Sequence, residues 1–312
     1  MIARATWTAV VAKALAATRP RLDVGNPETR SPYAGRIAVL ATMHCKEEAI
    51  APALACTLRL IVSSAPGLDT DQLGTFSGTI ARQGTMLDVA VRKARLGMRA
   101  AALPLGLASE GTFGPHPMIP FIPSGAEVLV FVDDEKGIVV SERLLTTATN
   151  FDHLVVLPGD ALEPFLERVG FPEHGLLVRP NDDRRGGVFA QGIVDRPCLD
   201  WVVAQAACVS SDGRAQIETD MRAHLNPTRM KSLAVLAERL ARRLLSLCPA
   251  CRTPGFGCTE TRTGLGCLEC GAPTRMTVAE IFCCTKCEHR EERLRWDGLR
   301  AAPAQYCPAC NP

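Results

Sequence analysis

The sequence predicts an α/β fold, with a mixed-sheet core and flanking helices followed by a small C-terminal ribbon-like module. Two observations lead to this fold class. Apolar, β-rich runs alternate with helical patterns as far as residue 247, which is typical of α/β domains. Beyond that point, ten of the fourteen cysteines fall between Cys248 and Cys310. We therefore expect three parts: an N-terminal extension (1–34), the α/β core (35–247) and a cysteine-rich module (248–312).

The composition is that of a globular chain. Of the 312 residues, 47% are hydrophobic and 22% are charged, and the formal net charge is +2. A nearly neutral chain gives no electrostatic reason to expect nucleic acid or a membrane surface as a partner. The N-terminus has apolar residues at helical spacing, but Lys13 interrupts them and no clear small-residue cleavage site follows. We interpret it as a short helix or a loose extension of a cytoplasmic chain, with a secretory signal as the alternative.

The first half of the core is predicted from hydrophobic runs and helix signals. The run "RIAVLAT" (36–42) and the run "LRLIVSS" (58–64) are strands on either side of a helix that bends near Pro52. A long loop with one short strand covers residues 66–84. The next helix covers residues 85–101. Thr85 and Asp88 form the pattern of a helix N-cap with an acidic residue three positions on, and one apolar stripe follows the helix: Leu87, Val91, Ala94 and Met98.

An acidic residue ends the next apolar run, "LPLGLASE". A carboxylate in that place is costly unless it is paired or reaches an open cleft, so Glu110 at the predicted strand tip is either a surface turn residue or part of a site. A hairpin (126–142), a helix (159–170), a strand (174–180) and a helix (196–208) follow. The last helix begins at Asn226 and Pro227, which are typical N-cap and first-turn residues.

Eight cysteines form four C-x-x-C pairs, which is the strongest signal in the sequence. The pairs are Cys248/Cys251, Cys267/Cys270, Cys284/Cys287 and Cys307/Cys310. Because this spacing aims both sulfurs at one metal, the eight thiolates predict two tetrahedral zinc sites, and hence a zinc ribbon. Four protein ligands leave no open position on the metal, so we expect structural rather than catalytic zinc. A module with few large apolar side chains needs such a metal to fold.

The pairing of these four motifs has two candidate schemes. A sequential scheme joins the first motif to the second, and a nested scheme joins the second to the third. The strand character of "TRMTVAEIFC" (274–283) favours the nested scheme. Cys258 and Cys283 are left over as packing residues or spare thiols. The module carries eight Lys or Arg and seven Asp or Glu, so a structural or protein-contact role is favoured over nucleic-acid binding, despite a small patch around Arg290 and Trp296.

The core contains no standard catalytic motif, but it offers a constellation of charged residues at predicted turns and helix starts. Carboxylates for Mg²⁺ and cations for phosphate are the parts that phosphoryl chemistry needs. The candidates are His44, Lys46, Asp88, Arg92, Lys93, Glu110, Glu218, Asp220, Arg222, His224 and Arg229. Each residue also has an ordinary interpretation: Lys46 as a helix-start residue, Asp88 as a cap, His224 as a satisfied histidine.

At these residues the core resembles the inosine-triphosphate pyrophosphatase superfamily. The matching segments are "VLATMHCK" with Lys46, "TMLDVAVRKA" with Asp88 and Lys93, "LASEGTFG" with Glu110, and "HLNPTRMKSLAVLAERL" with His224 and Arg229. The chain departs from the pattern at Val89, where the superfamily has asparagine, and in the spacing of His224 and Arg229, which are adjacent there. As a whole, the chain also resembles an uncharacterised bacterial family that joins such a core to a C-terminal cysteine-rich ribbon.

The superfamily resemblance implies Mg²⁺-dependent hydrolysis of non-canonical purine nucleoside triphosphates. It implies that Glu110 binds the metal and that Asp88 shares it or orients water. Lys46 and Lys93 would hold phosphates, while His224 and Arg229 would contact the base or the far phosphates. Two alternatives remain open: another phosphate-ester enzyme, or a non-catalytic nucleotide- or protein-binding scaffold that uses the zinc module as its contact surface.

Overall fold

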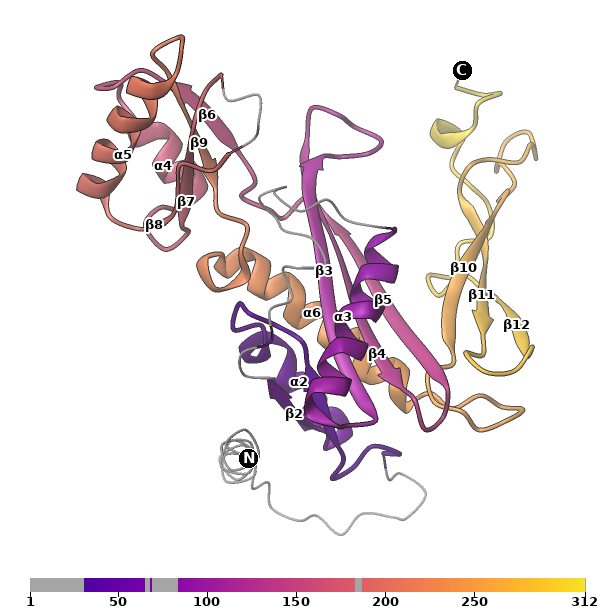
Figure 1. Ribbon diagram of the computed structural model, residues 1–312. Helices are drawn as coiled ribbons and strands as arrows, with labels where there is room; N and C mark the ends of the chain where they lie inside the picture. The colour runs from indigo at the N-terminus through magenta and orange to yellow at the C-terminus, as the bar shows by residue number, and fades with distance from the viewer. Residues whose placement is uncertain (1–30, 65–67, 69–83, 183–186, 312) are drawn as a thin grey trace. The chain divides into compact units, whose positions relative to one another are not determined.

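The computed structural model describes residues 31–64, 68, 84–182 and 187–311 (Figure 1). Most of the predicted N-terminal extension and of the predicted loop over 66–84 lies outside these residues. The chain forms two compact units. The first contains the described residues up to Glu135 and those from Ser141 to Ala241, and the second contains Lys136–Val140 and the chain from Arg242 onward.

The first unit is built on a mixed five-stranded sheet with the order β2-β1-β3-β4-β5. Strand β1 runs parallel to β2 and β3, and β4 runs antiparallel to β3. The strands are β1 (Ile37–Leu40), β2 (Ile61–Ser64), β3 (Leu105–Pro115), β4 (Pro123–Asp133) and β5 (Ile138–Thr146). The prediction that Glu110 ends its strand is wrong: β3 continues to Pro115, because β4 pairs with it over its whole length and Glu110 lies opposite Val128.

Helix α2 (Glu47–Leu58) follows β1, and helix α3 (Met86–Ala101) packs on β1, β3 and β4. A capping box at Thr85 and Asp88 starts α3, as predicted. Of the predicted apolar stripe, Ala94 and Met98 are buried, whereas Leu87 and Val91 are only partly buried; the buried face also carries small residues such as Gly97, together with Lys93. Small residues let the helix approach the sheet closely: a Cβ at Gly106 of β3 would lie 2.5 Å from the Met98 side chain.

A second, four-stranded antiparallel sheet with the order β6-β9-β7-β8 completes the first unit. Its strands are β6 (His153–Val156), β7 (Leu176–Pro180), β8 (Ala190–Ile193) and β9 (Ala215–Thr219). Helices α4 (Glu163–Val169) and α5 (Arg196–Val209) share an apolar core with this sheet. The short helix η3 (Ala223–Leu225) then leads to α6 (Pro227–Leu245), whose first turn is capped as predicted, since Asn226 Oδ1 accepts the Arg229 amide at 2.9 Å.

The second unit contains a three-stranded antiparallel sheet with the order β10-β11-β12. Its strands are β10 (Gly257–Thr263), β11 (Thr277–Cys283) and β12 (Arg290–Leu294), and a short helix, η4 (Ala304–Tyr306), precedes the last cysteine pair. Within the described ranges, every helix of the protein is too short or too polar to cross a membrane.

Candidate functional site

The eight paired cysteines form two groups of four sulfurs. Within each group, all four Sγ atoms lie within 4.8 Å of one another. The first group is Cys248, Cys251, Cys284 and Cys287, and the second is Cys267, Cys270, Cys307 and Cys310. Cross-pair Sγ–Sγ distances are 3.5 and 3.7 Å in the first group and 3.6 and 3.9 Å in the second. Four sulfurs bound tetrahedrally to zinc at about 2.3 Å lie about 3.8 Å apart, so both groups fit the metal.

The pairing joins the first motif to the third and the second to the fourth, so the nested prediction is wrong and the sequential scheme does not hold either. The reason is the antiparallel sheet. Successive connections in such a sheet alternate between its two ends. The first and third motifs therefore flank the end where Gly257, Cys283 and Arg290 are neighbours, and the other two belong to the opposite end. Cys258 and Cys283 lie outside both groups.

A buried ion pair joins α3 to β3 in the first unit. Lys93 Nζ lies 2.5 Å from Glu110 Oε1, and the two side chains are only 9% and 3% exposed. Helix α3 packs on this face of β3, which explains why a lysine in the buried stripe of the helix meets a carboxylate in the middle of the strand. Glu110 is therefore not a surface turn residue: it lies inside β3, is buried and is paired with Lys93.

A second buried ion pair joins α6 to β4. Arg229 Nε lies 2.5 Å from Glu127 Oε1, with the side chains 0% and 1% exposed, and Arg229 Nη2 lies 3.3 Å from Glu127 Oε2. Glu127 is opposite Gly111 in the β-ladder, so its carboxylate stands on the face of the sheet that Glu110 does not use. Gly111 makes room for it, because a Cβ there would lie 2.5 Å from the Glu127 carboxylate.

Lys46 lies at the turn from β1 to α2 and contacts β3 at Ser109. Its ammonium donates to the Ser109 carbonyl at 3.3 Å and to the Ser109 hydroxyl at 3.0 Å. The side chain is buried, and this desolvation, reinforced by the charge of Arg229, lowers the pKa of Lys46 to about 7. Glu127 and Glu110 favour the charged form but do not compensate.

Two histidines stack beside Lys46. The rings of His44 and His224 have their centroids 5.1 Å apart, and this stacking joins the β1–α2 turn to η3. Burial lowers the pKa of His44 to about 4, and the charge of Lys46 contributes in the same direction. The pKa of His224 is also lowered, first by burial and then by Arg222. Both rings are therefore neutral near pH 7 and offer one donor and one acceptor nitrogen each.

The predicted residues therefore lie on both faces of β3. Lys93 pairs with Glu110 on one face and Arg229 pairs with Glu127 on the other, while Lys46 bonds to Ser109 and His224 stacks on His44. Glu127 was missed, although it carries the same signal as Glu110, a carboxylate inside an apolar run. Three further candidates form ion pairs elsewhere: Asp220 with Arg222 at 2.6 Å and Glu218 with Arg179 at 2.9 Å.

Asp88 does not join the cluster. It is exposed, and its carboxylate accepts the Thr85 amide at 2.9 Å and the Thr85 hydroxyl at 2.7 Å, which lowers the pKa of Asp88. The Glu110 carboxylate is paired with Lys93 and that of Asp88 is bonded to Thr85, so the structure gives no support for the predicted magnesium site. In the part of the chain that the structure describes, the cysteine groups are also the only places where three or more metal-ligating side chains meet.

The comparisons identify the family. A domain of unknown function, DUF6671, matches residues 93–312. The chain belongs to the DUF6671 family. The matched part contains both cysteine groups and the residues of both buried ion pairs, Lys93 with Glu110 and Arg229 with Glu127. His44 and Lys46 precede it. No curated protein matches the chain.

Proposed function

We propose that this DUF6671 protein binds a phosphate-bearing ligand, of which a nucleotide is the expected class, at Lys46 in its first unit. We also propose that its second unit is a zinc ribbon with two structural zinc ions. The observation that carries the first proposal is the position of Lys46. Its ammonium is buried and hydrogen-bonded to the neutral oxygens of Ser109.

The charges around β3 favour an anionic ligand. Three buried cations, Lys46, Lys93 and Arg229, lie close to two buried carboxylates, Glu110 and Glu127. The carboxylates are paired with Lys93 and Arg229, so the Lys46 ammonium, in the protonated form that predominates below its pKa of about 7, has no ion-pair partner among the described residues. A buried charge without a counter-ion is costly, and a bound phosphate would supply that counter-ion. The neutral rings of His44 and His224 add hydrogen-bonding capacity beside it.

We propose binding rather than magnesium-assisted hydrolysis, because the carboxylates of both predicted metal ligands already interact with other residues. Glu110 pairs with Lys93, and Asp88 caps α3. This choice corresponds to the nucleotide-binding scaffold among the alternatives of the sequence analysis. Turnover of nucleoside triphosphates with Mg²⁺ separates the two functions: release of diphosphate at enzymatic rates would favour the pyrophosphatase.

The charges of the second unit support structural zinc and a protein-contact role over nucleic-acid binding. The arginines of its sheet pair with carboxylates on the same sheet, which leaves little net positive charge for phosphates. The pairs are Arg262–Glu292 at 2.5 Å, Arg290–Glu260 at 3.2 Å and Arg293–Glu291 at 2.6 Å. The eight thiolates fill two tetrahedral sites completely, so the metal would hold the fold and take no substrate.

The test of the ligand proposal is calorimetric titration of the purified protein with pyrophosphate, adenosine triphosphate and inosine triphosphate, without divalent metal. Lys46→Met keeps the length of the side chain and removes its charge, and it should lower the affinity at least tenfold. Lys231→Met, an exposed lysine on α6, is the matched control and should bind as the wild type does. Absence of binding by the wild type, or equal affinity of Lys46→Met, would refute the proposal.

A further inference from the structure

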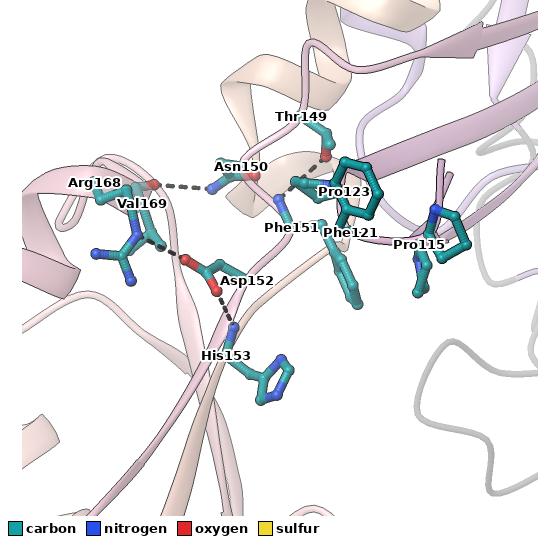
Figure 2. A pocket seen from close by; sticks show the side chains of 11 residues that line it. Pro115, Phe121, Pro123, Thr149, Asn150, Phe151, Asp152, His153, Arg168 and Val169 are labelled. Atoms are coloured by element: carbon teal, nitrogen blue, oxygen red, sulfur yellow. Dashed lines mark hydrogen bonds and ion pairs between the residues drawn. The ribbon is translucent and has the colours of Figure 1, made fainter. Parts of the chain in front are cut away.

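The first unit has a pocket of about 550 Å³ at the far end of the β3–β4 hairpin (Figure 2). Prolines and an aromatic ring from the hairpin line one part of it, and residues of the β5–β6 connection, β6 and α4 line the rest. Its lining residues are Pro115, Pro120, Phe121, Pro123, Thr149, Asn150, Phe151, Asp152, His153, Arg168 and Val169. The volume lies within the usual range of small-molecule sites.

The polar groups behind the wall are engaged with one another. The Phe151 amide donates to Thr149 Oγ1 at 3.2 Å, and Asn150 Nδ2 donates to the Val169 carbonyl at 2.9 Å. Asp152 accepts the His153 amide and Arg168 Nε, both at 2.8 Å. Such a network holds the wall in place and leaves its apolar atoms to face the cavity.

Two features specify the ligand. Phe121 is 87% exposed although it lines the pocket, so most of the ring surface is open to a partner. Arg168 donates its Nε to Asp152 and its Nη1 to the Pro164 carbonyl at 3.4 Å, and its guanidinium lies 5.4 Å from the centroid of the Phe165 ring. Its other terminal nitrogen, Nη2, makes no hydrogen bond among the described residues, and the exposed His153 ring lies on the other side of Asp152 (Figure 2). Aromatic rings prefer to stack on aromatic rings, and a guanidinium prefers an anion.

We propose that this pocket binds a flat aromatic ring system that carries one anionic group. The ring packs between the prolines and phenyl rings, and the anionic group faces Arg168. The site is separate from Lys46: Pro115 lies four residues beyond Gly111 on β3, which corresponds to about 13 Å of strand.

The probe for the test is 1-anilinonaphthalene-8-sulfonate, whose fluorescence rises in an apolar site. We expect saturable binding at one site per chain. Phe121→Ser should raise the dissociation constant about fivefold through loss of stacking. Met118→Ser is the matched control: Met118 is 77% exposed on the same hairpin loop but does not line the pocket, and its loss should change the constant less than twofold.

A second comparison tests the anionic group. Arg168→Gln should weaken the sulfonate probe about fivefold and leave the neutral analogue N-phenyl-1-naphthylamine unchanged. The sulfonate should bind Lys46→Met as it binds the wild type, which separates this proposal from that of the phosphate site. Non-saturable binding, equal losses in Phe121→Ser and Met118→Ser, or equal losses of both probes in Arg168→Gln would overturn it.

Discussion

Replacing Glu110 by glutamine tests the interpretation of the buried cluster. The change keeps the size of the side chain and removes its charge, which leaves the Lys93 ammonium buried without its carboxylate at 2.5 Å. Breaking a buried pair from one side costs about 3–5 kcal/mol. For a unit of this size, each kcal/mol corresponds to a shift of roughly 2–4 °C in melting temperature, so we expect a loss of about 6–20 °C.

The assay is thermal unfolding without divalent metal, measured by calorimetry so that the transitions of the two units are resolved. The double variant Glu110→Gln with Lys93→Met removes both charges and should recover most of the loss, since a neutral replacement of a buried pair is often neutral or stabilising. Glu135→Gln is the control, because its pair with Arg36 is exposed and is worth no more than about 1 kcal/mol.

Two results would refute this reasoning. A Glu110→Gln variant as stable as the wild type would mean that Lys93 does not depend on the carboxylate. Stabilisation of the wild type by Mg²⁺ that disappears in Glu110→Gln would make Glu110 a metal ligand, as the superfamily resemblance implies. In that case the Lys93–Glu110 pair would belong to the metal-free protein only, and metal-dependent hydrolysis would be favoured over binding alone.

The other predictions concern zinc, pH and packing. Elemental analysis should find two zinc ions per chain, a number unchanged in Cys258→Ser and reduced in Cys267→Ser. Chelation of the zinc should unfold the second unit first, since each such site supplies on the order of 10 kcal/mol of folding free energy. The affinity of sulfate, whose charge is constant from pH 5 to 9, should fall as the pH rises above about 7, because the Lys46 ammonium then loses its proton. A sulfate affinity that does not change with pH would contradict the lowered pKa of Lys46. Gly111→Ala should cost about 1–3 kcal/mol in chemical denaturation, because its Cβ would lie 2.5 Å from the Glu127 carboxylate, and wild-type stability would contradict that contact.

The sequence by itself determined the features that depend on neighbours within a few residues. The capping box at Thr85 and Asp88 and the start of α6 at Asn226 are made by side chains that reach backbone amides three positions on, so the local pattern contains all the information. The C-x-x-C pairs are local in the same sense. The sequence also showed that Glu110 needs a partner, because a carboxylate inside an apolar run is too costly to bury alone.

The tertiary structure alone decided which distant groups meet. Arg229 and Glu127 are 102 residues apart, and they meet because the first turn of α6 brings Arg229 to the face of β4 that carries Glu127, opposite Gly111 in the ladder. The cysteine motifs combine as first with third and second with fourth because the three strands of the ribbon alternate in direction. The cost of burial requires that a buried charge has a counter-charge. Which residue supplies that counter-charge, and which cysteine pairs share a metal, depends on strand order and helix packing, and these are not determined within one local segment.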